Sequence, residues 1–207
     1  MIDLYVINLA TRNDRWEHII KTFSDPEINL IKVEAEVDLK KGWIGCFLSH
    51  KKCLRIAKEK GLKNIMVIED DCLPMNLNKD TFKSRLFKIK NYLDSHDDWN
   101  IYLGGTATIS SSNYKNIIKH EDETFVEFTK AYMTHMICYN NNVYDLYLNQ
   151  DVIKPVDEFW FGKIKALISV PFLATQLEGY SDIIRRKKSD TKRINDANNI
   201  LVKYIEK

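Results

Sequence analysis

Apolar residues recur along the chain at two spacings, one typical of helices and one typical of strands. Steps of three and four residues predict amphipathic helices around Trp16–Phe23, Phe47–Ala57, Phe82–Leu93 and Ile194–Ile205. Alternating or continuous apolar runs predict strands at Leu4–Leu9, Ile31–Val37, Asn64–Ile68 and Trp99–Leu103. Because strands and helices alternate through the first half, we expect an α/β fold with a mostly parallel sheet and helices on both faces.

The second half of the chain has a less regular pattern. Strands are predicted at Thr124–Thr129 and Tyr132–Tyr139, as a hairpin or an antiparallel edge, and another at Ala166–Val170. Val143–Leu148 has a helical pattern, and the segment 185–193 is basic and polar. Internal repeats and low-complexity linkers are absent, so residues 1–207 are expected to form a single domain.

Three consecutive carboxylates follow the most apolar of these strands. The stretch Ile65–Pro74 reads IMVIEDDCLP, so four apolar residues run directly into Glu69, Asp70 and Asp71. Neighbouring carboxylates raise one another's pKa unless a positive charge lies between them. Two interpretations remain open from this stretch alone: a solvated turn after a strand, or a cation-binding site.

Other chemistry is predicted at the same edge of the sheet, because ligands of open parallel sheets bind beyond the carboxyl ends of the strands. The first strand ends at Asn8 and is followed by Arg12 and Arg15, and a later one ends in Gly104-Gly105. Arginines hold phosphate, carboxylates hold a hard divalent cation, and glycines admit a ligand close to the backbone. This combination suits a nucleotide diphosphate. The alternatives are a solvated helix face for the arginines and a simple turn for the glycines.

Composition narrows the class of protein. A net charge of +2 on 207 residues gives no electrostatic case for nucleic acid as the main partner. The four cysteines form no C-x-x-C pair, so no zinc or redox motif is indicated and free thiols in a reducing compartment are expected. The N-terminus has no signal-peptide pattern and no stretch is long and apolar enough to span a bilayer. We therefore expect a cytoplasmic protein, at most peripheral at a membrane.

Seven segments together resemble glycosyltransferase family 25, which includes bacterial lipooligosaccharide and procollagen galactosyltransferases. In chain order they read VINLATRNDR, IGCFLSH, MVIEDDCLP, WNIYLGG, AYM, KPVDEFW and QLEGYSDI. The resemblance implies a GT-A-type fold, with a Rossmann-like nucleotide-sugar half at about 1–105, an irregular acceptor half at about 106–184, and a basic linker and helix at 185–207. It also implies a UDP-sugar donor, most often UDP-galactose, a divalent metal (Mn²⁺ or Mg²⁺) and inversion at the anomeric carbon.

The resemblance assigns the acid run to the metal. Asp71 is the first choice of metal ligand, and Glu69 or Asp70 would contact metal or ribose. His50, in GCFLSH, lies by the site without a defined role; a structural, hydrogen-bonded histidine is the alternative. The segment expected near the nucleotide contributes Asn8, Arg12 and Arg15.

A carboxylate must take the proton from the attacking acceptor hydroxyl. Asp157, in PVDEF, is the preferred base and Glu158 the second choice, although Asp157 could equally cap a short helix. Gln176 and Asp182 are expected to close the donor site, with a helix cap as the alternative for Asp182. Trp43 is either a platform for stacking a sugar or a core residue.

Rival functions stay open at this point. The loop before Gly45 is shorter than in the family, which suggests a module that binds a sugar nucleotide or glycan without turnover. A metal-dependent phosphohydrolase is a further alternative, whereas a receiver domain is disfavoured because its acid pair would follow the first strand. The acceptor could be a glycan, a lipid-linked lipooligosaccharide or hydroxylysine. The basic run Arg185–Lys188 is either a solvated linker or a contact with an anionic membrane.

Overall fold

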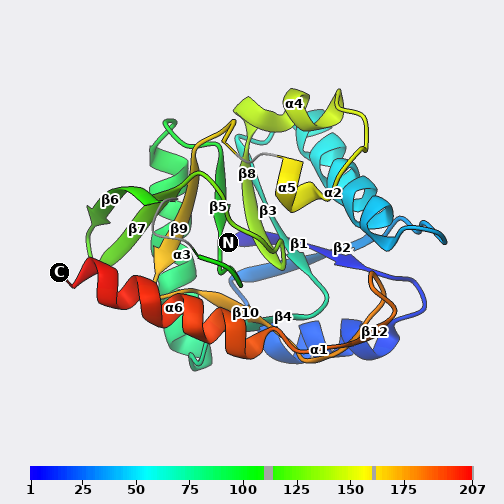
Figure 1. Cartoon of the computed structure of the whole chain (residues 1–207), viewed down its shortest axis with the longest axis horizontal. Helices are drawn as coiled ribbons and strands as arrows, with labels where there is room; N and C mark the ends of the chain where they lie inside the picture. The colour runs from blue at the N-terminus through cyan, green and yellow to red at the C-terminus, as the bar shows by residue number, and fades with distance from the viewer. Residues whose placement is uncertain (110–113, 160–161, 207) are drawn as a thin grey trace.

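The computed structural model describes residues 1–109, 114–159 and 162–206. An eight-stranded sheet of order β2-β1-β3-β8-β5-β9-β7-β6 forms its centre, as Figure 1 shows. The strands of this sheet are β1 (Ile2–Asn8), β2 (Ile28–Glu34), β3 (Asn64–Glu69), β5 (Ile101–Leu103), β6 (Tyr114–His120), β7 (Glu123–Phe128), β8 (Met136–Asn140) and β9 (Ala166–Val170). Two small ribbons pair β4 (Cys72–Pro74) with β10 (Ala174–Gln176) and β11 (Gly179–Ser181) with β12 (Arg186–Lys188).

Helices cover both faces of the sheet, because each carries one apolar side. They are α1 (Asn13–Phe23), α2 (Gly42–Glu59), α3 (Lys79–Ser95), α4 (Tyr144–Leu148), α5 (Val156–Phe159) and α6 (Thr191–Ile205), and one 3₁₀ turn spans Asn141–Val143. Side chains of α1 and α3 belong to one buried cluster, and side chains of α2, α4, α5 and α6 to the other. None of the helices in these described ranges has the length and apolarity that a bilayer crossing requires.

The prediction of an α/β fold with a mostly parallel sheet flanked by helices is confirmed. β1 pairs in parallel with both β2 and β3, and β5 pairs in parallel with β9. β8 runs against β3 and β5, and β7 runs against β9 and β6. Six of the eight strands therefore point the same way, and the carboxyl ends of β1, β2 and β3 meet at one edge.

The predicted hairpin or edge formed by 124–129 and 132–139 is wrong. β8 begins only at Met136 and lies in the middle of the sheet, between β3 and β5. β7 pairs instead with β9 and with β6, a strand that the apolar pattern did not indicate. Every residue of β8 is buried, as a central strand requires, whereas β6 is mostly solvent-accessible. Adjacency in sequence therefore misled the pairing, because consecutive strands are only usually neighbours.

Some helix ends and strand limits in the structure agree with the predictions, and others differ from them by a few residues. Gly61 follows α2 with φ +63, the left-handed conformation that ends a helix, as predicted. The predicted caps of α1, Asn13 or Asp14, are wrong: Arg12 occupies the cap position, and the Asp14 carboxylate accepts hydrogen bonds from its guanidinium. β2 begins at Ile28 and ends at Glu34, earlier than the predicted limits.

Gly104 and Gly105 were predicted to let a ligand approach the backbone, but neither lines the cavity described in the next section. A Cβ on Gly105 would lie 2.3 Å from the carbonyl oxygen of Ala174, and one on Gly104 would lie 2.7 Å from the sulfur of Met136. The Gly104 carbonyl also accepts hydrogen bonds from Leu173 and Ala174. The close approach that these glycines permit is therefore between segments of the chain itself.

The segment after residue 184 is not a basic linker. Arg186–Lys188 forms β12, whose hairpin with β11 lies beside the loop that precedes α2. The guanidinium of Arg185 donates to the Leu39 carbonyl, and the backbone of Ile183 lies against Gly42. This hairpin therefore forms one wall of the cavity described next.

Candidate functional site

A cavity of about 740 Å³ opens beyond the carboxyl ends of β1, β2 and β3. The first turns of α2, the segment around Met133 and Thr134, the start of α5 and the β11–β12 hairpin complete its walls. Most of the predicted site residues line it: Arg15, His50, Glu69, Asp70, Asp71, Asp157, Glu158, Gln176 and Asp182. The predicted edge of the sheet is therefore hollow, and the predicted chemistry is gathered there.

Asp70 is held firmly by two donors. It accepts hydrogen bonds from Asn8 Nδ2 at 2.8 Å and from an Arg15 guanidinium nitrogen at 2.7 Å. Asn8 is buried, also donates to the Arg12 carbonyl, and is not among the cavity-lining residues. Asn8 was expected to contact the nucleotide, but it lies outside the cavity lining. Its hydrogen bond instead orients Asp70.

Asp71 has one satisfied and one unsatisfied oxygen. Oδ2 accepts from Gln176 Nε2 at 2.8 Å and lies 3.4 Å from Arg15, whereas the buried Oδ1 has no hydrogen-bond partner among the described residues. Burial, reinforced by the negative charge of Glu69, raises the pKa of Asp71 from 3.8 to about 7. An ionised Asp71 is therefore unfavourable unless a cation approaches Oδ1.

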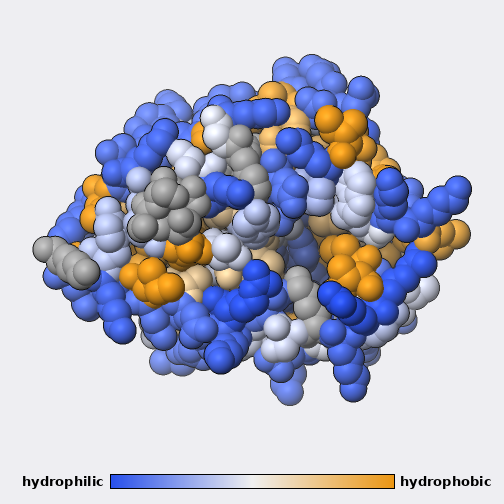
Figure 2. Space-filling model, viewed as in Figure 1, coloured by the Kyte–Doolittle hydropathy of each residue, from blue (hydrophilic) through white to orange (hydrophobic). Residues whose placement is uncertain are grey.

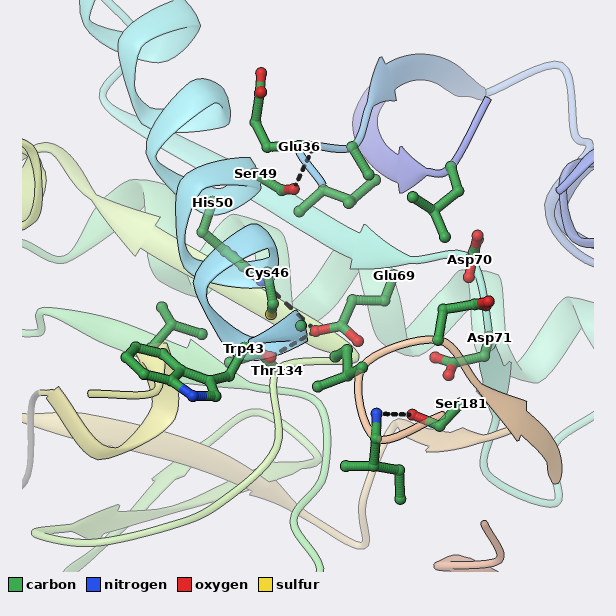
Figure 3. A pocket seen from close by; sticks show the side chains of 18 of the residues that line it. Glu36, Trp43, Cys46, Ser49, His50, Glu69, Asp70, Asp71, Thr134 and Ser181 are labelled. Atoms are coloured by element: carbon green, nitrogen blue, oxygen red, sulfur yellow. Dashed lines mark hydrogen bonds and ion pairs between the residues drawn. The ribbon is translucent and has the colours of Figure 1, made fainter. Parts of the chain in front are cut away.

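The pKa of Glu69 is shifted in the opposite direction to that of Asp71. Burial alone would raise its pKa, but His50 and the Thr134 hydroxyl outweigh burial and lower it. Thr134 Oγ1 donates to Glu69 Oε1 at 2.5 Å, and His50 Nε2 lies 3.6 Å from the same oxygen. Figure 3 shows His50 and Cys46 directed from α2 toward this carboxylate, with Asp70 and Asp71 on its other side. Glu69 therefore ionises more readily than an ordinary glutamate, whereas Asp71 keeps its proton to a higher pH than an ordinary aspartate.

Divalent cations that prefer oxygen ligands fit this cluster. Mn²⁺ and Mg²⁺ take carboxylate oxygens. Asp71 and Glu69 both line the cavity, and the buried Oδ1 of Asp71 has no hydrogen-bond partner among the described residues. A cation there would also oppose the effects of burial and of the Glu69 charge, and would lower the pKa of Asp71. Asp71 and Glu69 are accordingly the residues that would hold the ion.

The two arginines fasten the cavity wall to α1. Arg12 pairs with Asp182 at 2.5 Å and with Asp14, while Arg15 donates to the Tyr180 carbonyl at 2.5 Å as well as to Asp70. Arg15 lines the cavity, but Arg12 is not among its lining residues. Of these two arginines, Arg15 is therefore the one that lines the cavity, and Arg12 holds the hairpin through Asp182.

Asp157 reaches the same cavity from α5. Its Oδ2 accepts from the backbone N–H of Met133 at 3.1 Å, and burial raises the pKa of Asp157 above its usual range. Met133 has φ +88, a strained backbone for a residue with a side chain, and the next residue is the Thr134 that holds Glu69. This short segment therefore links the candidate base to the acid cluster. Trp160 of the KPVDEFW motif lies outside the described residues.

Several residues that line the cavity were not predicted, among them Cys46, Thr134 and Tyr180. Trp43, for which a sugar platform and a core position were both open, lines the cavity as well. Cys46 lies one helical turn before His50, a spacing that would have pointed to it once α2 was recognised. Thr134 and Tyr180 carried no sequence signal, because their positions depend on β8 and the β11–β12 hairpin.

Comparison with known proteins places the chain in a family. The family model for glycosyltransferase family 25, described as an LPS biosynthesis protein, matches residues 27–154. The chain belongs to glycosyltransferase family 25. This match runs from β2 to just before α5 and therefore includes α2, the acid run and β8. The resemblance inferred from the sequence motifs is confirmed.

Procollagen galactosyltransferases are among the proteins that the chain resembles in sequence. The chain is 30% identical over 132 residues to procollagen galactosyltransferase 2 of Homo sapiens, covering 49% of this chain and 20% of that protein. Procollagen galactosyltransferase 1 of Danio rerio is 31% identical over 131 residues, covering 49% and 21%. The matched segment thus spans about a fifth of the length of these relatives.

Solved structures show weaker similarity. A crystal structure of A197 from STIV superposes with a TM-score of 0.42 and 10% identity, covering 90% of this chain and 93% of that one. A glycosyltransferase involved in glycosylation of the major capsid of PBCV-1 gives 0.41 and 11%, covering 70% and 62%. TM-scores at this level do not by themselves establish a common fold.

The acid cluster predicts an unusual pH dependence of stability in the metal-free protein. The pKa of Asp71 is higher in the folded than in the unfolded chain, so the folded state binds its proton more tightly. The free energy of unfolding should therefore fall as pH rises from about 4 to about 7, by up to a few kcal/mol. Asp71→Asn should remove most of this fall. Urea unfolding in EDTA at several pH values measures it.

The exposed Asp97 provides a matched control, since Asp97→Asn also removes one carboxylate. That variant should keep the pH profile of the wild type. An Asp71→Asn profile that falls as steeply as that of the wild type would show that another group is responsible.

Proposed function

We propose that this protein transfers a sugar, galactose in the first instance, from a UDP-sugar to an acceptor hydroxyl, with a divalent metal and with inversion. Membership of the family and the galactosyltransferase relatives support the reaction class. The observation that carries the metal-dependent form is Asp71, which lines the cavity and whose buried Oδ1 has no partner among the described residues. A cavity of about 740 Å³ is also within the range of small-molecule sites.

Donor binding would use the acid cluster and Arg15. Asp71 and Glu69 would hold Mn²⁺ or Mg²⁺, which supplies stabilisation of the negative charge on the departing diphosphate. Arg15 adds a fixed positive charge within 3.4 Å of Asp71. Gln176 orients Asp71 through its amide, and Asp182 holds the hairpin in place through Arg12. Asp71 and Glu69 would thus bind the ion, and Arg15 would face the phosphates. Gln176 and Asp182 would position other residues.

Asp157 is the proposed general base. Inversion requires one carboxylate that removes the acceptor proton while the hydroxyl attacks the anomeric carbon. Burial keeps the pKa of Asp157 above that of an ordinary aspartate, which strengthens it as a base, and the Met133 amide fixes its orientation. Glu158, the next residue, also lines the cavity and is the second choice.

The first experiment measures UDP release from a panel of UDP-sugars, with Mn²⁺ or with EDTA. Release from one donor, UDP-galactose as first expectation, should require the metal. Asp71→Asn should lower the rate at least about 100-fold, because it removes a charge that holds the ion. The exposed-site variant Asp97→Asn should match the wild type.

The products separate the rival functions. A metal-dependent phosphohydrolase would release sugar 1-phosphate or free sugar with Mn²⁺, whether or not acceptor glycans are present. A module that binds without turnover would bind UDP with Mn²⁺, as calorimetry would show, and release nothing. If neither UDP nor the metal bound, the proposed donor site would be wrong.

The base assignment predicts a different pattern in Asp157→Asn. Asparagine can still accept the Met133 hydrogen bond but cannot take a proton, so transfer to the acceptor should fall about 10²- to 10⁴-fold. The dissociation constant for UDP with Mn²⁺ should stay within about twofold of the wild-type value, since Asp157 does not hold the ion. Glu158→Gln is the matched control, and a larger loss there than in Asp157→Asn would transfer the role to Glu158.

The rim of the cavity suggests where the acceptor is found. Val37, Leu39 and Ile184 are exposed on the two segments that meet beside the cavity mouth, with Leu39 78% exposed. Exposed basic residues lie on the same segments: Lys40, Lys41, Arg185, Arg186 and Lys187. Figure 2 shows a mostly hydrophilic surface on which such apolar groups stand out. We propose that this rim contacts an anionic membrane carrying a lipid-linked glycan, on the cytoplasmic side, where free cysteines persist.

Membrane contact predicts binding to vesicles that contain phosphatidylglycerol, and little binding to neutral phosphatidylcholine vesicles. Leu39→Glu should weaken binding about tenfold or more, because it removes apolar burial and adds repulsion. Ile117→Glu, an exposed apolar residue on β6 at the other end of the sheet, should bind as the wild type does. Sedimentation with vesicles at low and high salt measures this, and equal loss in both variants would reject the rim as the contact.

A further inference from the structure

A second set of ligands lies on the side of Glu69 opposite to Asp71. One ligand atom each of Cys46, His50 and Glu69 can be chosen so that all lie within 4.8 Å of one another. Cys46 and His50 are one helical turn apart on α2, and both are directed at the Glu69 carboxylate in Figure 3. The set combines a thiol, an imidazole and a carboxylate, unlike the all-oxygen cluster at Asp71.

His50 is the member that requires an explanation. Its side chain is fully buried, and Nε2 has no hydrogen-bond partner among the described residues, the nearest acceptor being Glu69 Oε1 at 3.6 Å. Nδ1 lies 2.9 Å from the Tyr139 hydroxyl, which fixes the orientation of the ring. Buried imidazole nitrogens without partners are rare, and a metal-bound imidazole usually has its other nitrogen held by such a partner.

Cys46 completes the set and connects it to solvent. Its side chain is half-buried and lines the cavity, whereas the other three cysteines are buried in the core. Because all three ligand residues line the cavity, an ion could reach them through it. Three protein ligands and one open position are the arrangement of non-structural zinc sites.

We propose that Cys46 Sγ, His50 Nε2 and the Glu69 carboxylate form a site for a thiophilic divalent metal, with Zn²⁺ as the principal candidate. Binding exchanges the thiol proton for the metal, so one proton is released for each ion bound. Thiolate and imidazole ligands select Zn²⁺ over Mg²⁺ and Mn²⁺, which prefer oxygen. The site is therefore chemically distinct from the Asp71 cluster, although the two share Glu69.

Because Glu69 belongs to both metal sites, the two ions would compete for it; the effect of this competition on activity rests on the proposed function. An ion on Cys46 and His50 would withdraw the Glu69 carboxylate from the donor metal, so Zn²⁺ should inhibit the Mn²⁺-dependent reaction. Cys46→Ser should relieve this inhibition, because a hydroxyl is a poor zinc ligand.

The test uses Co²⁺ as a spectroscopic probe on the full chain, without any sugar nucleotide. Wild type should show a thiolate-to-cobalt absorption band that saturates at one equivalent and disappears when Zn²⁺ is added. Cys46→Ser should lack the band, and His50→Gln should weaken Co²⁺ binding at least about tenfold through loss of one ligand. Asp71→Asn should retain the band, which separates this site from the oxygen cluster. Circular dichroism establishes that each variant is folded.

The absence of a band in folded wild type, or its persistence in Cys46→Ser, would overturn the proposal. If His50→Gln does not fold, Cys46→Ser and Glu69→Gln still decide, because each removes one ligand from the set. The cobalt band does not depend on turnover, so the two proposals can fail separately. A protein that shows the band but transfers no sugar would support this metal site and reject the proposed function. A protein that transfers sugar but shows no band would support the proposed function and reject this metal site.

Discussion

Carboxylates brought together away from water must each be neutralised, and much of this fold follows from that constraint. The last residue of β3 and the turn after it place three of them within one cavity wall. Arg15 of α1 and Gln176 of β10 donate hydrogen bonds to two of these carboxylates, and His50 of α2 lies 3.6 Å from the third. One oxygen, Oδ1 of Asp71, is left without a partner, and this gap is the physical reason for expecting a cation.

The same interactions hold together parts of the chain that are distant in sequence. Arg12 and Arg15 connect the β11–β12 hairpin to α1. Met133 and Thr134 are hydrogen-bonded to Asp157 of α5 and to Glu69, respectively. The site is therefore assembled from both halves of the chain around one continuous sheet. This arrangement explains why donor chemistry and the proposed base can share a single cavity although their residues are far apart in sequence.

Local patterns predicted the helices, the strands of the first half and the edge that carries the site. Apolar spacing is a local property, and the rule that ligands bind beyond parallel strands needs only strand order and direction. The central place of β8, the inward role of Asn8 and the packing role of Gly104 and Gly105 could not be predicted. Each depends on a partner remote in sequence, and the apolar pattern of a single strand does not identify its neighbour.

The central position of β8 also bears on how the chain matures during synthesis. β3 is complete at residue 69, yet its hydrogen-bonding edge toward β8 stays open until residues 136–140 have emerged from the ribosome. An apolar strand with an open edge is a point of entry for aggregation. Long-range pairing of this kind is slow because a long loop must close first. One edge of the acid-bearing strand thus stays open while about a third of the chain is synthesised, and this exposure follows from the topology rather than from any one residue.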